Sequence, residues 1–449
     1  MTGKIGESDM SRSKSLIDRI GDLYRWIDDR FKATALASVR YSFPSTFSHV
    51  LSNLGMATVI CFLVTVVTGL PLLIYYRPTP WNVAYDSIKF ITEEVAFGAL
   101  LRGVHYHSSN GMVLFSILHA IYVFFKRLYK GRFDFLWVTG VLLAVLTVLT
   151  AFTGYVLIFN DRAVEAQNIM MGITEAIHPL MKALFAGTGL SDRALRLYAF
   201  HIAILPTIIL AFLSVHLPRA LRISVPMIIG IFAVLLIATG IYPAELGPKY
   251  DPAITIQFMP PEWYFLWVFT LLRTWAPVIY VGVLIPGIWV VLMMLAPWID
   301  TGRRPRLTDR PKMAIIGVSS IVYFIYLTLR GVTGVGPPAT QIPAYEVVGV
   351  LIAVVLASGI VFRLITPMLN RRVKSPKRGE GRYLTPNIAT ALLLAIVGVQ
   401  VVLVWAFANA YIMRNSRLLS LDLGLILLGL GMSQHIYATA SKLPSSAKR

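Results

Sequence analysis

The chain contains ten uninterrupted apolar runs of about 20 residues each, and this feature limits its fold more than any other. A helix of about 20 residues spans the hydrocarbon core of a bilayer. Because 56% of the residues are hydrophobic and only 14% are charged, most of the chain is expected to lie in lipid. The sequence therefore predicts an all-α membrane protein with about ten transmembrane helices. The predicted spans are residues 52–76, 108–129, 137–159, 198–218, 224–243, 278–298, 312–330, 344–366, 385–412 and 418–437.

Basic residues give the chain a net charge of +19 and gather in alternate loops. They are concentrated at 126–132, 219–222, 303–312 and 371–382, after the second, fourth, sixth and eighth runs. The positive-inside rule places such loops in the cytoplasm, and ten spans then put both termini there. A basic chain can also bind nucleic acid, but this distribution follows membrane topology instead. We therefore expect lipid, and no nucleic acid, as a partner.

The N-terminal residues 1–40 are rich in lysine and arginine. Apolar residues recur at helical spacing between positions 14 and 34, which predicts an amphipathic helix on the membrane surface. A cleavable signal peptide is not expected, because no apolar core follows a short basic stretch. We assign residues 1–40 to a cytoplasmic amphipathic segment.

Cys61 is the only cysteine, and it lies within the first apolar run. A single cysteine forms no disulfide within the chain. The CxxCH motif of covalently held haem and the four-cysteine cluster of iron–sulfur centres are both missing from the sequence. Any iron–sulfur centre or c-type haem that works with this chain must therefore belong to another subunit.

Two histidine pairs lie inside apolar runs: His105 with His119, and His201 with His216. Their spacings of fourteen and fifteen residues return nearly to the same helix face, about one bilayer leaflet away, at about 100° and 1.5 Å per residue. A neutral imidazole is a standard axial ligand of haem iron, so two facing helices could hold two stacked haems. One histidine alone is more often a packed residue, but ionisable groups within membranes cluster at functional sites. His107 competes with His105, yet it lies about 120° away from His119 on a helix.

Two glycine pairs repeat this spacing on neighbouring runs. Gly55 and Gly69 are fourteen residues apart in the first run, as are Gly140 and Gly154 in the third. A flat porphyrin packs closely against a helix only where a side chain is missing. Packing between helices explains any single glycine, but not the shared period. The pattern predicts an N-terminal four-helix bundle for two haems, with ligands from the second and fourth runs and flat walls from the first and third.

Other residues near the histidines have both a functional and a structural explanation. Arg102 lies one helical turn before the first histidine and could pair with haem propionates or anchor the helix at the interface. Pro206 lies between the two histidines of the fourth run and is expected to bend that helix. Arg219 and Arg222 follow this run and could bind a quinone headgroup or haem propionates, although membrane topology also accounts for them.

The loop at 241–277, between the fifth and sixth runs, contains a carboxylate among prolines and aromatic residues. The topology places this loop on the outer side. Prolines fix the backbone, and aromatic side chains form the apolar wall of a ligand cleft, where a carboxylate can accept a proton from a hydroxyl. An interfacial Trp-Tyr belt would also explain the aromatic residues taken alone. The residues are Pro260, Pro261, Glu262, Trp263 and Tyr264.

These residues together resemble the cytochrome b subunit of the quinol-oxidising bc-type (Rieske/cytochrome b) complexes. The N-terminal half is especially similar to the chloroplast-type version. The resemblance covers roughly residues 50–365, and the haem-ligand set with the Pro-Glu-Trp-Tyr motif is its most specific part. The matching stretches are Thr68-Gly69, Tyr75-Tyr76-Arg77-Pro78-Thr79, Arg102-Gly103-Val104-His105, Trp137-Val138-Thr139-Gly140, Thr153-Gly154-Tyr155 and Pro261-Glu262-Trp263-Tyr264.

The resemblance implies two non-covalently bound haems of b-type. His105 and His201 would hold the iron nearer the outer face, and His119 and His216 the iron nearer the cytoplasm. Quinol would be oxidised beside the outer haem, with Glu262 or Tyr264 in proton exit. The same quinol site would include Pro261, Trp263 and Tyr155.

The resemblance also implies partners and a reaction. One electron would pass to a Rieske iron–sulfur protein and the other across the two haems to an inner quinone site, coupled to proton translocation. The chain would act within a larger respiratory complex with further cytochrome or oxidase subunits, as a homodimer.

The chain departs from the family in three places. Ile158-Phe159-Asn160 replace the usual Pro-Trp, so the quinol cleft is expected to be reshaped there. Asn53 occupies the position of the chloroplast-type cysteine, so no covalently held third haem is expected. The continuous chain adds two spans beyond the usual eight, from about 385, which suits a prokaryotic plasma membrane rather than an organelle. We expect a dihaem domain at 41–222, a quinol-site domain at 223–370, and a charged loop with two additional helices at 371–449.

Two other functions remain open from the residues. A dihaem membrane anchor of a hydrogenase or dehydrogenase also places histidines on helices, but it needs no outer Pro-Glu-Trp-Tyr loop. A haem-free transporter could use the histidines as proton relays, and it would lack the Soret absorption of a haem protein.

Overall fold

The computed structural model describes residues 22, 25–26, 53–217, 225–254, 259–274, 276–302, 306–333, 340–370 and 386–440. Within these ranges nine helical segments are long and apolar enough to cross a membrane, and there are two shorter apolar helices, Met227–Ile241 and Trp263–Leu272. Nine of the predicted runs overlap the nine long segments and the tenth overlaps Met227–Ile241, which confirms an all-α membrane fold. The predicted amphipathic helix at 14–34 lies mostly outside the described residues, of which 22, 25 and 26 are helical.

The transmembrane segments follow the chain order of the apolar runs. They are α2 (Leu54–Tyr75), α4 (Gly98–Lys126), α5 (Asp134–Tyr155), α8 (Leu190–Ala199) continuing through η4 (Phe200–Ile204) into α9 (Leu205–His216), α10 (Val225–Ile241), η6 (Ile279–Leu284) with α12 (Ile285–Ile299), α13 (Pro311–Val332), α14 (Ala344–Asn370), α15 (Pro386–Ile412) and α16 (Ser416–Ala440).

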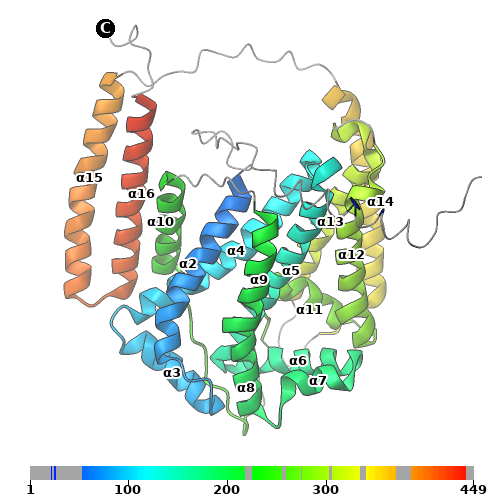
Figure 1. The fold of residues 1–449 in the computed structure, drawn as a ribbon, viewed down its shortest axis with the longest axis horizontal. Helices are drawn as coiled ribbons and strands as arrows, with labels where there is room; N and C mark the ends of the chain where they lie inside the picture. Colours follow the sequence, from blue (N-terminus) through cyan, green and yellow to red (C-terminus); the bar gives the residue numbers. More distant parts are fainter. Residues whose placement is uncertain are drawn as a thin grey trace, which may run out of the picture.

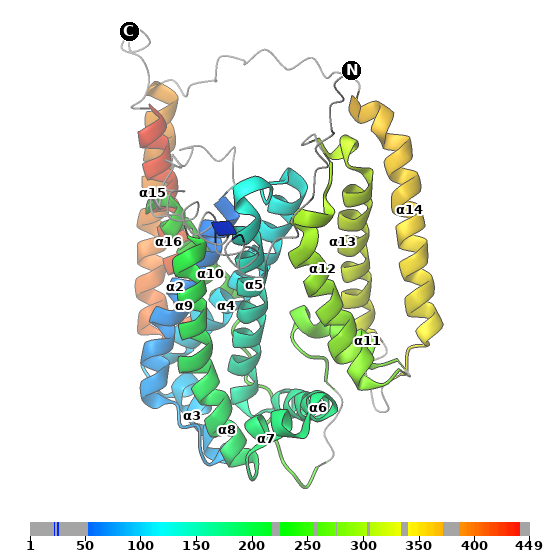
Figure 2. The same ribbon diagram turned by 45° about the vertical axis from the view of Figure 1, so that its right-hand side comes forward.

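Four of these segments, α2, α4, α5 and α9, form a central bundle (Figure 1). Helices α12, α13 and α14 stand on one side of the bundle. Helices α15 and α16 stand on the other side, against α10 (Figures 1 and 2). The two additional helices thus lie far from α14, although α14 precedes them in the chain.

Short helices that the sequence reasoning did not predict gather at one end of the bundle, which topology predicts to be the outer end (Figure 2). They are too short or too polar to register as apolar runs. Helix α4 likewise begins ten residues before the predicted span, because its first three turns include Arg102 and His105. The short helices are α3 (Trp81–Glu93), α6 (Asp161–Ile177) and α7 (Pro179–Ala186), with α11 (Leu266–Leu272) packed against α13.

Prolines alter two of the spans in the same way. Pro206 and Pro286 each lie at the start of an α-helix that continues directly from a π-helical segment. A proline has no N–H to donate and collides with the carbonyl four residues earlier, so the preceding turn widens. The bend predicted at Pro206 therefore takes the form of the π segment η4, which contains His201.

A buried ionic cluster joins the central bundle to α12 and α13. The Asp300 Oδ2 atom accepts hydrogen bonds from Arg127 at 3.0 Å, Tyr129 at 2.9 Å and Arg310 at 2.9 Å. The side chains of Asp300 and Arg310 are each 1% exposed. Burial alone would raise the pKa of Asp300, but the hydrogen bonds from Tyr129 and Arg310 outweigh it and hold that pKa below its usual value.

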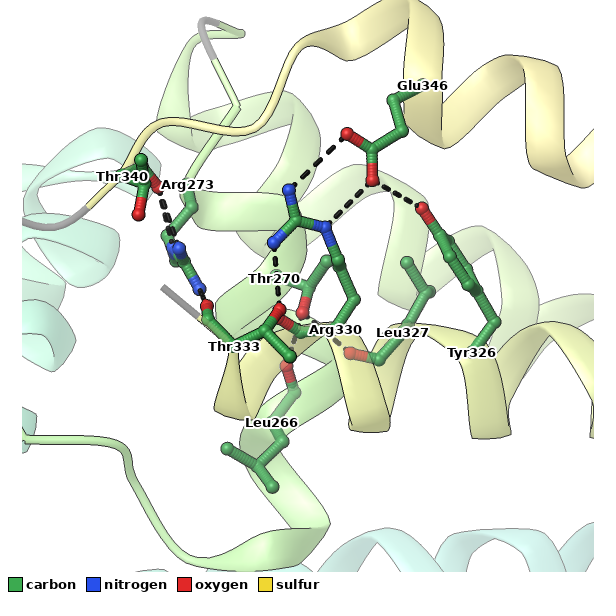
Figure 3. A network of polar contacts seen from close by, with 9 residues as sticks. All are labelled: Leu266, Thr270, Arg273, Tyr326, Leu327, Arg330, Thr333, Thr340 and Glu346. Carbon is green, nitrogen blue, oxygen red and sulfur yellow. Dashed lines mark hydrogen bonds and ion pairs between the residues drawn. The ribbon is translucent and has the colours of Figure 1, made fainter. Parts of the chain in front are cut away.

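A second polar cluster joins α11, α13 and α14 (Figure 3). Arg330 donates to Glu346 at 2.8 Å, and the Tyr326 hydroxyl donates to the same carboxylate at 2.9 Å. Arg273, at the end of α11, donates to the backbone carbonyls of Thr333 and Thr340. These bonds tie both the carboxyl end of α13 and the start of α14 to the segment that carries the Pro-Glu-Trp-Tyr loop.

Candidate functional site

The four predicted ligand histidines form two pairs across the central bundle. His105 on α4 and His201 in η4 face each other with ring centroids 6.3 Å apart and an interplanar angle of 72°. His119 and His216 are one leaflet further along the same two helices. His107 instead contacts the backbone carbonyl of Tyr242 at 2.6 Å, so the structure pairs His105, not His107, with the fourth span.

Each of the four predicted glycines lies directly against one of these imidazoles. A methyl carbon added at Gly69 would meet His105 Cε1 at 3.1 Å, and one at Gly154 would meet His201 Cε1 at 2.6 Å. The corresponding distance is 2.9 Å from Gly55 to His119 and 2.9 Å from Gly140 to His216. Helix α2 thus places a glycine against each histidine of α4, and α5 places a glycine against each histidine of the fourth span.

Three of the imidazoles are oriented by a threonine that directly precedes the facing glycine. The hydroxyls of Thr68, Thr153 and Thr139 lie 3.3, 3.2 and 3.1 Å from Nδ1 of His105, His201 and His216. Backbone carbonyls of Thr65 and Thr150 also lie 3.0 Å from Nδ1 of His105 and His201.

The threonine hydroxyls fix the protonation of these rings. Each hydroxyl donates its own hydrogen to a carbonyl of its own helix, so its oxygen accepts from the histidine. A backbone carbonyl likewise only accepts. The proton therefore sits on Nδ1, and the Nε2 lone pair is free to bind a metal.

His119 departs from this pattern. The residue before its facing glycine is Leu54, which has no hydroxyl to offer. Its Nδ1 atom is buried and has no hydrogen-bond partner among the described residues. Helix α2 begins at Leu54, and the residue four before Gly55 lies outside the described residues.

The two imidazoles at each site suit a metal ion whose other ligands come from a cofactor and not from the protein. No group of three or more His, Cys, Asp or Glu side chains able to hold a metal ion is found within the described ranges. Two imidazoles are too few for an ion bound by protein alone, which needs three to six ligands. They suffice for haem iron, whose remaining positions the porphyrin fills. Glycines whose missing side chains leave the rings room complete a fit to two haems.

Arg102 has a clear structural role. Its guanidinium is buried and donates to the carbonyls of Ala244 at 2.6 Å and Glu245 at 2.8 Å. It therefore holds the start of the loop after α10 onto α4. Its pairing with haem propionates stays a prediction, and Arg219 and Arg222 lie outside the described residues.

The first residues of the loop after α10, 242–247, are held through their backbone carbonyls. The side chains that donate to these carbonyls come from α3, α4 and the start of α6. Besides Arg102 and His107, they are Asn160, which donates to the Leu246 carbonyl at 2.8 Å, and Tyr85, which donates to the Gly247 carbonyl at 2.7 Å. Residues 242–247, the first part of the loop that carries Glu262, are thus held in place by these bonds.

Glu262 is the centre of a polar cluster at the predicted outer end. Its Oε1 atom lies 3.3 Å from Arg162 of α6, and its Oε2 atom accepts from the Tyr106 hydroxyl of α4 at 3.4 Å. The side chain of Glu262 is 11% exposed, and that of Arg162 is 40% exposed. Sequence reasoning missed both partners, because they are distant in the chain and belong to no short motif. The carboxylate is oriented by two partners and nearly enclosed.

Aromatic side chains surround this carboxylate. Trp263 donates from its indole to Asn110 of α4 at 2.8 Å, which fixes the ring. Tyr264 is buried against Val113 and Ala151, and Tyr155 is buried nearby with a hydroxyl that has no hydrogen-bond partner within the described part of the chain. The structure therefore brings Glu262, Trp263, Tyr264 and Tyr155 together between α4, α5 and the loop. Ligand sites typically combine an apolar, aromatic lining with a few polar groups, and these four side chains have that composition.

Comparison with known proteins gives consistent matches. Residues 39–225 match the family model described as Cytochrome b/b6/petB, and residues 249–351 match Cytochrome b(C-terminal)/b6/petD. The cytochrome b6 of Acaryochloris marina (strain MBIC 11017) is 34% identical over 200 residues, which cover 43% of this chain and 93% of that protein. The cytochrome b6 of Prochlorothrix hollandica is 34% identical over 202 residues, or 43% and 90%.

Among solved structures, a chain of "Hyperthermophilic respiratory Complex III" has a TM-score of 0.57 at 20% sequence identity. The match covers 79% of this chain and 99% of that chain. At this identity the likeness concerns the fold.

Proposed function

The chain belongs to the cytochrome b/b6 family, and from this premise we propose that it is a dihaem subunit that oxidises quinol at the outer side of a respiratory complex. Family membership makes it a haem-binding, electron-transporting membrane protein of an oxidoreductase complex. The proposal adds the ligands, the quinol site and the path of the electrons. We divide the chain for this purpose into the dihaem part at 41–222, the quinol-site part at 223–370 and the additional helices at 371–449.

The observation that carries the proposal is the match between four imidazoles and four glycines. His105 and His201 would bind one haem, and His119 and His216 the other, each through Nε2. The haems, when bound, supply one-electron acceptors on both sides of the membrane core. The protein supplies fixed imidazole orientation through the threonines, and close approach of α2 and α5 through the glycines.

The quinol would bind between Trp263, Tyr264 and Tyr155, with a hydroxyl directed at Glu262. The carboxylate of Glu262 would accept the proton of that hydroxyl, since a general base must lie within hydrogen-bond reach of the proton it takes. Arg162 and Tyr106 hold the two carboxylate oxygens in place, and each oxygen keeps a lone pair that could accept from the quinol hydroxyl. The buried aromatic rings exclude water from the acceptor.

One electron of the quinol would pass to a Rieske iron–sulfur protein, which would be a separate subunit because the single cysteine of this chain cannot hold such a centre. The second electron would reach a quinone near the cytoplasmic side. Proton release outside and uptake inside would then move charge across the membrane. Further cytochrome or oxidase subunits and a second copy of this chain would complete the complex, in a prokaryotic plasma membrane with both termini cytoplasmic.

Redox titration of the purified complex followed in the visible haem bands tests the ligand assignment. His105→Ala and His119→Ala should each remove one of two low-spin transitions and leave the other. His107→Ala is the matched control and should keep both. Loss of both transitions with either single change would contradict two separate sites.

Steady-state quinol oxidation tests the acidic loop. Glu262→Gln keeps the size of the side chain and its bond from Tyr106 but removes its charge. We expect slower quinol oxidation with unchanged haem spectra. Normal turnover in this variant would refute the proton role of Glu262.

A further inference from the structure

We propose that Leu54 tunes the reduction potential of the haem that His119 would hold, because it leaves that ligand without the hydroxyl hydrogen bond that the other three histidines receive. The inference rests on the proposed haem ligands. It concerns a difference within this chain: a leucine precedes one of the four facing glycines, and a threonine precedes each of the other three.

The three threonines and Leu54 occupy the same position in four copies of one local arrangement. Each precedes the glycine that lies against an imidazole, on a helix packed beside the histidine helix. Three copies read Thr-Gly, with a hydroxyl 3.1 to 3.3 Å from Nδ1. The fourth reads Leu54-Gly55, although Gly55 approaches His119 as closely as Gly140 approaches His216.

Burial makes the missing bond chemically significant. Leu54 is 5% exposed, and Nδ1 of His119 is buried, so bulk water does not reach that nitrogen. A neutral imidazole that binds through Nε2 carries its proton on Nδ1. Among the described residues, that N–H of His119 therefore has no acceptor, whereas in the other three histidines a threonine hydroxyl accepts from it.

An acceptor on Nδ1–H pushes electron density onto the imidazole and makes it a stronger donor to iron. A stronger donor favours the oxidised metal and lowers the reduction potential. The haem of His105 and His201 has two imidazoles strengthened in this way, and the haem of His119 and His216 has one. Leu54 therefore raises the potential of the second haem above the value that a threonine would give.

The test compares Leu54→Thr with Leu54→Val, because valine has nearly the shape of threonine and lacks only the hydroxyl. Both variants are made in the full complex, and both haem potentials are measured by spectroscopic redox titration. We expect Leu54→Thr to lower the potential of the transition that His119→Ala removes, relative to Leu54→Val. The other transition should not move.

A second variant pair keeps the proposal testable if changes at position 54 disturb folding. Thr139→Val removes the hydroxyl from His216, so it should raise the potential of the same transition, and Thr153→Val should raise the other one. Electron paramagnetic resonance of the oxidised haems should change only for the affected site.

The outcomes separate the two proposals. If His119→Ala leaves both transitions in place, the ligand assignment fails. If His119→Ala removes one transition, but Leu54→Thr and Leu54→Val give it equal potentials, the ligands stand and the role of Leu54 is refuted. Equal potentials in Thr139→Val and the parent would likewise overturn it.

Discussion

Replacing Gly154 by alanine should displace His201 and weaken the binding of one haem. The new methyl carbon would lie 2.6 Å from Cε1 of His201, whereas ordinary contact begins at 3.4 Å, so the ring must move by about 0.8 Å. The ring is held at Nδ1 by the Thr150 carbonyl at 3.0 Å and the Thr153 hydroxyl at 3.2 Å. Such a movement stretches both hydrogen bonds, so the free-energy cost of overpacking and the cost of the lost hydrogen bonds add together.

The magnitude follows from these two costs. Overpacking costs about 1–3 kcal/mol, and each hydrogen bond contributes about 1 kcal/mol. With both bonds lost, a total of about 3–5 kcal/mol corresponds to haem binding weaker by roughly 150- to 4000-fold. At Gly69 the methyl carbon would lie 3.1 Å from His105, so the shift needed is smaller and the loss should be least of the four.

The assay is the haem content per polypeptide by pyridine haemochrome, before and after incubation with an apoprotein that captures free haem. Gly230→Ala and Gly349→Ala are the controls, because a methyl carbon at either site meets nothing within 4 Å. They should retain haem like the parent. If Gly154→Ala retains haem as well as these controls do, the close contact between glycine and imidazole does not limit the site.

Three further predictions concern contacts away from the haem ligands. Arg162→Met should raise the KM for quinol by about two- to fivefold in steady-state assays, since a partly exposed ion pair contributes about 0.2–1 kcal/mol; an unchanged KM would exclude Arg162 from positioning Glu262. Asp300→Asn should destabilise the protein by about 3–5 kcal/mol in thermal unfolding near neutral pH. Because the folded-state pKa of Asp300 is lowered, its contribution is present above the unfolded pKa and lost as the pH falls through the folded one, so the variant should also lose part of the parent's acid sensitivity. Gly424→Leu should separate α16 from α10, since even a methyl carbon there would lie 2.8 Å from the Ala233 carbonyl; helix cross-linking between introduced cysteines on α10 and α16 should fall, and unchanged cross-linking would contradict the packing.

The membrane fold was predictable because each span is a long apolar run, and one bilayer thickness sets its length. The polar ends of helices were not predictable in this way. Helix α4 begins at Gly98, but Arg102 and His105 interrupt the apolar run over its first turns. The interfacial helices α3, α6 and α7 were missed for the same reason. Apolar periodicity detects burial in lipid and does not detect short helices that lie along the surface.

The imidazole and glycine positions were predictable because helical spacing alone relates residues fourteen apart. The structure shows a relation that spacing does not contain: each glycine belongs to one particular histidine on another helix. The ion pair of Arg162 with Glu262 joins residues one hundred positions apart, so only the packed fold reveals it. The threonines were visible as Thr-Gly motifs, but their action on Nδ1 was not.

The segment that follows α10, residues 242–247, is held in place through its backbone carbonyls. The side chains that hold it, such as Arg102 and Asn160, all donate to backbone carbonyls between positions 242 and 247. A carbonyl oxygen is the same in every residue type. Most side chains of residues 242–247 can therefore change without loss of these bonds, except at Gly247, whose φ of 70° favours glycine. A change in one of the anchoring donors would instead release the segment that precedes the acidic loop.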